Sequence, residues 1–171
     1  MQLADAIAAL GSLPESLARR TRGLDDARLR FKPDAGVFSV LESVCHLRDI
    51  EVEGYAERLE LLLEEDSPLL PDLDGAALAR SRRYQQQIFS TALEAFTAAR
   101  HANLQTLRRL APVDLERRGE YENLGVVTLD QVLDMWVAHD REHLQELDQL
   151  LTVLHNPAAI QAKPSQSLSQ R

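Results

Sequence analysis

The chain has 171 residues and a formal net charge of −8 at pH 7, with 44% hydrophobic and 27% charged residues. Length and composition fit one ordinary soluble domain. The acidic balance argues against nucleic acid as a partner, because phosphate binding needs a cationic surface.

Cellular location is predicted from three features. The one cysteine, Cys45, excludes an internal disulfide. No apolar run reaches the roughly 18 residues of a membrane span, and the first residues lack a secretory signal pattern. We therefore expect a cytoplasmic protein that does not bind membranes.

The N-terminal half predicts three helical segments. Residues 2–10 should form a short helix that ends at Gly11, and a further piece with Pro14 near its start should run to residue 23. Residues 24–38 predict a loop. Ser39 begins a capping box for a helix that should continue to residue 65. The predicted buried stripe of this helix comprises Leu41, Val44, Cys45, Val52, Tyr55, Leu59 and Leu62.

The C-terminal half predicts two longer helices. After a break at residues 66–72, a helix is expected over residues 74–110, with Tyr84 and Ile88 among its apolar positions. Residues 111–127 predict a loop that can include a short hairpin. Thr128 and Gln131 should cap a last helix that extends to residue 155.

Together these segments predict an all-α protein, an antiparallel four-helix bundle over residues 1–155. Residues 156–171 are rich in Ser, Gln and Pro and predict a flexible tail. Sites in such bundles are built from inward-facing side chains of neighbouring helices.

The last helix carries a histidine pair, His139 and His143. Spacing by four residues places both imidazoles on one helix face, about 6 Å apart along the axis, where they can bind one metal ion. His143 falls within the apolar stripe and His139 at its edge. Buried imidazoles need partners, so the alternatives are metal ligation and core histidines that bond to carbonyls or carboxylates.

His46 lies on the helix over residues 39–65, nearly opposite its apolar stripe and on the same face as Glu42, Asp49 and Glu53. Periodicity alone therefore predicts an exposed side chain. His46 can be a ligand only if this face borders a cleft with the last helix. Asp49 and Asp140 are candidates to orient the imidazole rings, although they could equally be solvated carboxylates.

The segment from Phe38 to Glu51 resembles the start of the second helix in the DinB-like superfamily, a family of metal-binding four-helix bundles. Residues 125–129, followed by His139 to Leu144, resemble the last-helix motif of that superfamily. The resemblance covers about residues 5–153. It departs from the family at Phe38, where many members have Trp, a difference that should affect packing more than chemistry.

The resemblance implies that His46, His139 and His143 bind a divalent transition metal, with zinc or nickel expected first. Family members include bacillithiol transferases and a mycothiol-dependent isomerase. It therefore implies a metal-dependent thiol transferase or hydrolase that acts on a small molecule, which can itself be a low-molecular-weight thiol. The rivals are a non-catalytic metal-binding or stress-response protein, with a homodimer expected through exposed helix faces, and a bundle with purely structural histidines.

Three other patterns in the sequence indicate chemistry less strongly. Residues 139–143 also match H-x-x-E-H, the inverted zinc-peptidase pattern, but Glu142 projects away from the His143 stripe and too little chain follows for a further ligand. Cys45 is expected to be a core residue rather than a nucleophile. The cluster Arg80 to Tyr84 fits a solvated helix face better than an anion pocket.

Overall fold

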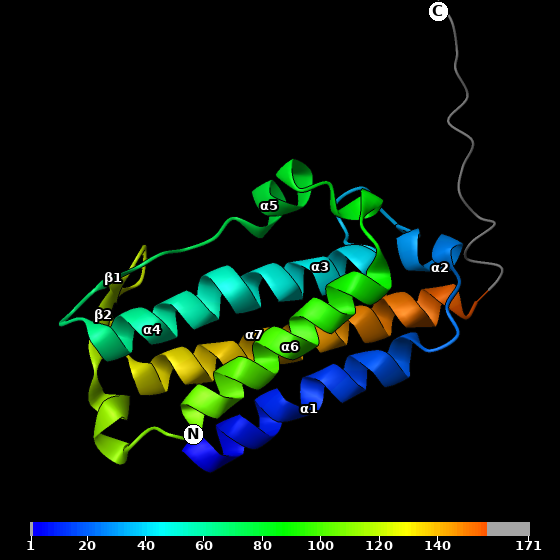
Figure 1. Cartoon of the computed structure of the whole chain (residues 1–171). Coiled ribbons are helices and arrows are strands. Elements are labelled where there is room, and N and C mark those ends of the chain that lie inside the picture. The colour runs from blue at the N-terminus through cyan, green and yellow to red at the C-terminus, as the bar shows by residue number, and fades with distance from the viewer. Residues whose placement is uncertain (1, 157–171) are drawn as a thin grey trace, which may run out of the picture.

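The computed structural model describes residues 2–156, which form a bundle of four long helical segments (Figure 1). The segments are α1 (Leu3–Thr21), the continuous run α3 (Val40–Asp49), η1 (Ile50–Ala56) and α4 (Glu57–Glu64), then α6 (Phe89–Leu107) and α7 (Leu129–Leu154). The predicted four-helix bundle is confirmed. The predicted tail lies outside the described residues except for Asn156, so the domain boundary stays a prediction.

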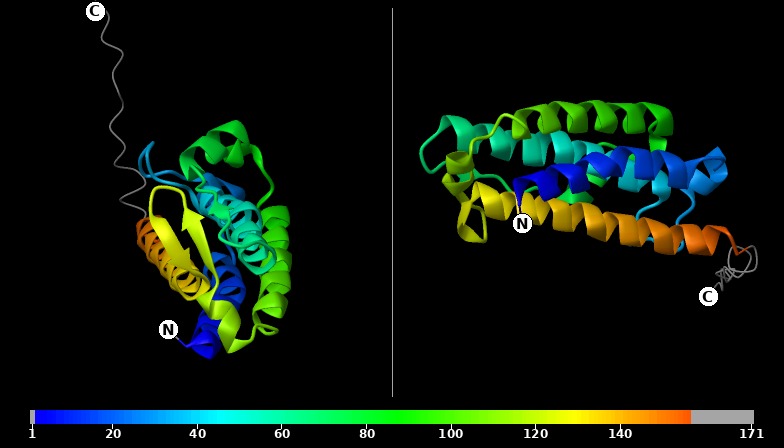
Figure 2. Two further views of the ribbon diagram at one scale, coloured as in Figure 1. Left: turned by 90° about the vertical axis from the view of Figure 1, so that its left-hand side faces the viewer. Right: turned by 90° about the horizontal axis from the view of Figure 1, so that it is seen from below.

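Helix directions set how the bundle is connected. α1 and α7 run one way, whereas α3–α4 and α6 run the other (Figures 1 and 2). Both α1 and α3 pack against α6 and α7. Because α3 and α6 are parallel neighbours, residues 65–88 have to return along the bundle before α6 begins. This crossover carries the short elements β1 (Leu69–Leu70), α5 (Gly75–Ser81) and η2 (Tyr84–Gln86).

A small sheet closes the end of the bundle where α7 begins (Figure 1). After the short helix η3 (Pro112–Glu116), β2 (Arg118–Tyr121) and β3 (Gly125–Thr128) form the predicted hairpin, with Gly119 opposite Val127. β1 adds to β2 in parallel, with Leu69 opposite Glu120. A strand of two residues has no periodicity in the sequence, so this pairing was not predicted.

The first helix is continuous, and the predicted break at Gly11 is wrong. Pro14 lies inside α1 and cannot donate the backbone hydrogen bond that the Leu10 carbonyl would accept within a helix. Arg100 of α6 supplies that bond instead, from Nη1 to Leu10 O at 2.9 Å. A partner 90 residues away in sequence therefore allows the helix to pass through Pro14.

The second long helix contains a π-helical turn, η1, that changes which residues face inward. Val52 was predicted to be buried but is 47% exposed, whereas the other six residues of the predicted stripe are buried. A π turn is wider than an α turn and shifts the phase of every residue after it. Glu51 therefore takes the inward position, and it is fully buried.

The predicted helix over residues 74–110 is divided into α5, η2 and α6. Arg83 adopts a left-handed conformation, with φ of 51°, which ends the regular helix. Tyr84 turns into the core and donates from its hydroxyl to Asp49 Oδ2 at 2.6 Å. Ile88, one of the apolar positions of the predicted helix, is exposed. The predicted loop at residues 24–38 also contains a short helix, α2 (Asp26–Arg30), capped by the Asp25 side chain.

A buried ionic cluster joins the four segments. Arg100 is 1% exposed and forms bidentate hydrogen bonds to Glu51 of η1, both at 2.8 Å, and to Asp140 of α7, at 2.6 and 3.1 Å. Asn103 and Trp136 also donate to Glu51. With the bond to Leu10 O, one guanidinium satisfies buried acceptors from α1, η1 and α7. Burial raises the pKa of Glu51, and Arg100 and Asn103 oppose this shift.

Removing this guanidinium should destabilise the fold strongly. Arg100→Met is expected to lower the free energy of unfolding by about 3–5 kcal/mol, because two buried carboxylates and a carbonyl lose their partner. Urea denaturation followed by circular dichroism measures the loss. Arg19→Met, at an exposed arginine paired with Glu15, should cost less than about 1 kcal/mol. Equal losses in the two variants would contradict the role assigned to the cluster.

Candidate metal centre

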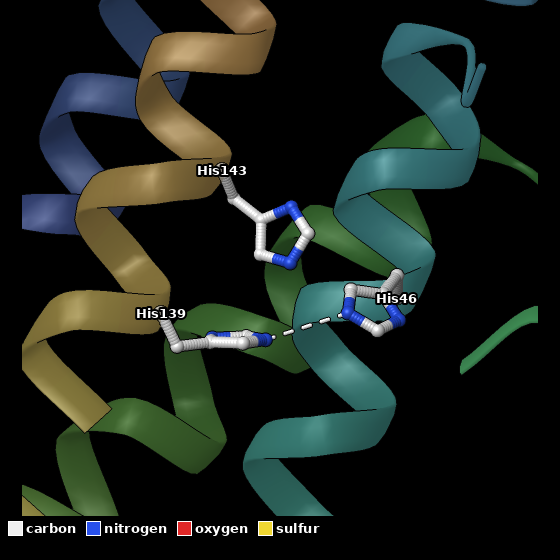
Figure 3. A group of neighbouring side chains, drawn as sticks. All are labelled: His46, His139 and His143. Carbon is white, nitrogen blue, oxygen red and sulfur yellow. Dashed lines mark hydrogen bonds between the residues drawn. The ribbon is translucent and has the colours of Figure 1, made fainter. Parts of the chain in front are cut away.

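The structure brings together all three histidines predicted to form the site. His46 projects from α3, and His139 and His143 project from α7 toward it (Figure 3). The Nε2 atoms of His46 and His139 are 3.4 Å apart. The ring centroids of His143 lie 4.7 Å from His46 and 4.4 Å from His139. One nitrogen from each ring lies within 4.8 Å of the other two.

Helix geometry accounts for this convergence. The capping box between Ser39 and Glu42 is present and fixes the start of α3, seven residues before His46. The matching box between Thr128 and Gln131 fixes the start of α7. The spacing of four then places both α7 rings on one helix face, as the sequence predicted. In the structure this face is directed at α3 (Figure 3).

His46 is buried, with 8% of its surface exposed, so the prediction of an exposed side chain from periodicity is wrong. The crossover and the preceding loop cover this face of α3. Phe38 lies against the ring, with centroids 5.5 Å apart. Gly75, at the start of α5, lies so close that a Cβ atom there would be 2.5 Å from His46 Cε1.

The chemistry of the three rings fits a divalent transition metal. Nδ1 of His46 and Nδ1 of His139 are buried and have no hydrogen-bond partner among the described residues. Burial, together with His143 and His139, lowers the pKa of His46 to about 3. Burial and His139 also lower the pKa of His143. His46 and His143 are therefore neutral at pH 7, the form that binds metal.

The residues that orient the rings differ from those predicted. Glu146 accepts a hydrogen bond from His143 Nδ1 at 2.8 Å, which leaves the other nitrogen of His143 facing the cluster. Asp140 Oδ1 is 3.7 Å from His139 Nδ1, beyond hydrogen-bond distance, and its carboxylate binds Arg100. The carboxylate of Asp49 is taken by Arg48, Tyr84 and Arg82.

Sequence reasoning missed Glu146 and Gly75. Glu146 could have been found, because a carboxylate three residues after His143 lies on the same helix face. Gly75 carried no such signal, since only the folded crossover brings it against His46.

The cluster borders a cavity of about 560 Å³. His46 and His143 form part of its lining, between the loop that contains Val37, the start of α5 and the last turns of α7. A volume of this size is typical of small-molecule sites. Two of the three rings, those of His46 and His143, therefore lie at the wall of a ligand-sized space.

The remaining candidates have structural roles. Cys45 is buried in an apolar cluster, and burial raises its pKa to about 11, which makes it a core residue as predicted. Glu142 is exposed, which disfavours the peptidase alternative. Arg82 pairs with Glu53 and Asp49 rather than lining the cavity.

The close approach of Gly75 to His46 generates a prediction. Gly75→Ala should displace the His46 ring and weaken metal binding by at least tenfold, because metal ligands tolerate little displacement. Gly36→Ala is the matched control: Gly36 also lines the cavity, but a Cβ there would make an ordinary 3.6 Å contact. Zinc titration of both variants measures the effect. Equal affinities would show that the contact does not position His46.

The pKa of His46 predicts how the metal-free protein responds to acid. The pKa is about 3 in the folded chain and about 6.5 when unfolded. Its contribution to stability is therefore complete above pH 6.5 and is lost as pH falls toward 3. Between pH 6.5 and 5 this should remove about 1–2 kcal/mol of unfolding free energy.

Urea denaturation of chelator-treated protein measures this slope. His46→Asn removes the titrating group and should reduce the pH dependence, whereas His101→Asn, at an exposed histidine, should leave it unchanged. The same slope in wild type and His46→Asn would contradict the assignment.

Comparison with known proteins places the chain in a family. The 24%-identical "Putative metal-dependent hydrolase BH0277" of Halalkalibacterium halodurans aligns over 140 residues, 82% of this chain and 81% of that protein. "Putative metal-dependent hydrolase OB0782" of Oceanobacillus iheyensis is 25% identical over 138 residues, 81% and 79% of the two chains.

A solved structure has a similar fold. YfiT from Bacillus subtilis, described as a probable metal-dependent hydrolase with an unusual four-helix bundle topology, superposes with a TM-score of 0.82. The match covers 90% of this chain and 88% of YfiT at 22% identity, so it bears on the fold alone. The family model of the DinB superfamily matches residues 9–147. The chain therefore belongs to the DinB superfamily.

Proposed function

We propose that this protein is a metal-dependent enzyme that acts on a small molecule, with hydrolysis as the reaction favoured first. The observation that carries the proposal is the convergence of three imidazoles beside a ligand-sized cavity, with one nitrogen of each ring within 4.8 Å of the other two. Purely structural histidines would be expected to hydrogen-bond to carbonyls or carboxylates in the core, whereas among the described residues the rings of His46 and His139 face each other through Nε2 and their Nδ1 atoms have no partner.

His46, His139 and His143 would hold the ion. Three neutral nitrogen ligands leave it a net positive charge and open coordination positions, and a bound zinc or nickel ion would supply Lewis acidity toward water, thiol or carbonyl oxygen. Glu146 orients His143 through Nδ1. The Arg100–Asp140 pair fixes the turn of α7 that carries His139. Phe38 and the start of α5 shield the His46 ring from water.

Hydrolysis is favoured because both aligned relatives carry the name of metal-dependent hydrolases. Thiol transfer remains a second reaction to test, because the same open positions would accept a thiolate sulfur. The cavity argues for catalysis over simple metal storage, since a storage site does not need space for a second molecule. Small-molecule substrates, rather than nucleic acid, suit a site of this size.

Metal analysis tests the site itself. Protein purified without an affinity tag, then reloaded with zinc or nickel, should hold about one ion per chain. His46→Ala, His139→Ala and His143→Ala should each reduce affinity by at least tenfold, whereas His101→Ala should match wild type. Retention of stoichiometric metal in all three site variants would contradict the ligand set.

An activity screen tests catalysis. Hydrolytic substrates such as esters, amides and lactones, and thiols with electrophiles, should be compared with and without chelator. Turnover that disappears with chelator and returns with added metal supports an enzyme. Metal binding without turnover on either substrate group would favour the non-catalytic alternative.

A further inference from the structure

The cavity beside the three histidines is lined mainly by apolar side chains. Its apolar lining comes from the loop before α3, from α5 and from the end of α7. The apolar side chains are Pro33, Val37, Phe38, Ala76, Leu150 and Val153. Because such walls cannot hydrogen-bond, they favour an apolar group over water.

Polar groups on the lining are few and none is a permanent cation. Ser43 and Gln149 are neutral, and Glu146 is the one carboxylate that residues 2–156 place on the lining. No lysine or arginine of this described part of the chain lines the cavity. A substrate body with a carboxylate or phosphate would therefore lose hydration without gaining a cationic partner, which is costly.

Two cations on the neighbouring elements, Lys32 and Arg82, are already paired. Lys32, just before the cavity loop, lies 2.9 Å from Glu42. Arg82, at the end of α5, contacts both Glu53 and Asp49, at 2.6 and 2.9 Å. Turning Lys32 toward the cavity would leave the buried Glu42 without a cation, and turning Arg82 would leave Glu53 without one. These contacts hold the two cations away from the cavity.

We infer that the substrate has two parts: a group that binds the metal, and an uncharged apolar body that occupies the cavity away from the histidines. This inference rests on the proposed function and names the substrate class for the same site. The cavity should therefore disfavour molecules whose body carries a carboxylate or phosphate at a distance from the metal-binding group.

Hydroxamates test the inference, because their metal-binding group is constant while the attached body varies. Acetohydroxamate, hexanohydroxamate and adipic acid monohydroxamate should be titrated into the zinc-loaded protein by calorimetry. Hexanohydroxamate should bind on the order of 100-fold more tightly than acetohydroxamate, about three- to fourfold for each buried methylene. The terminal carboxylate of the adipic compound should cancel most of that gain.

A charge-introducing variant ties the selectivity to this cavity. Val153→Lys places a cation on the wall at the end of α7 and should reverse the preference, so that the adipic compound binds more tightly than hexanohydroxamate. Val126→Lys is the control, because Val126 is exposed on β3 and does not line the cavity. It should retain the wild-type order.

The outcomes separate this inference from the function on which it rests. Zinc and acetohydroxamate binding with no gain from the longer apolar chain would overturn the inference and leave the metal site standing. Equal or tighter binding of the adipic compound to wild type would also overturn it. Failure to bind zinc would overturn the proposed function, and the inference with it.

Discussion

The arrangement of the bundle depends on the hydrogen bonds made by the guanidinium of Arg100. It is buried, so its charge must be matched, and two carboxylates from different helices match it. It also donates a hydrogen bond to the Leu10 carbonyl, because Pro14 has no backbone N–H to do so. Asp140 is the sequence neighbour of His139. The Arg100 guanidinium, which also binds α1 and η1, therefore fixes the position of α7 along α3. The same buried ion pair therefore helps to position the turn of α7 from which His139 projects toward His46.

The candidate site has the opposite character, since two of its buried nitrogen atoms have no partner among the described residues. Arg100, Glu51 and Asp140 have hydrogen-bond partners, whereas Nδ1 atoms of His46 and His139 have none among the described residues. The pKa of His46 is low mainly because burial disfavours the charged ring. The protein satisfies the arginine cluster, whereas three imidazole nitrogens lie within 4.8 Å of one another and could hold an ion.

No helix within residues 2–156 is long and apolar enough to cross a membrane.

Sequence reasoning worked where the signal is local. The capping boxes at Ser39 and Thr128 predicted the starts of α3 and α7, and the spacing of His139 and His143 predicted their shared face. It failed where a distant segment decides the outcome. Nothing near Pro14 indicates that Arg100 will bond the Leu10 carbonyl, and nothing in the pattern around Val52 indicates a π-helical turn.

His46 illustrates the same limit at the site. Its face of α3 is polar, so periodicity predicts exposure, yet the crossover buries it with Gly75 and Phe38. The family resemblance identified His46 as a ligand candidate, whereas the residue pattern by itself did not. Glu146 lay within reach of a local rule, and Gly75 did not.

The metal-binding candidates and much of the cavity wall come from different parts of the chain. The three imidazoles come from the long helices, whereas much of the cavity wall comes from connecting stretches, residues 33–38 and the start of α5. Connections accept insertions and replacements more readily than packed helices do. Replacements in these connecting stretches can thus change which small molecule is recognised while the three histidines stay the same. A bundle that returns along its own length in this way provides a natural scaffold for diversification.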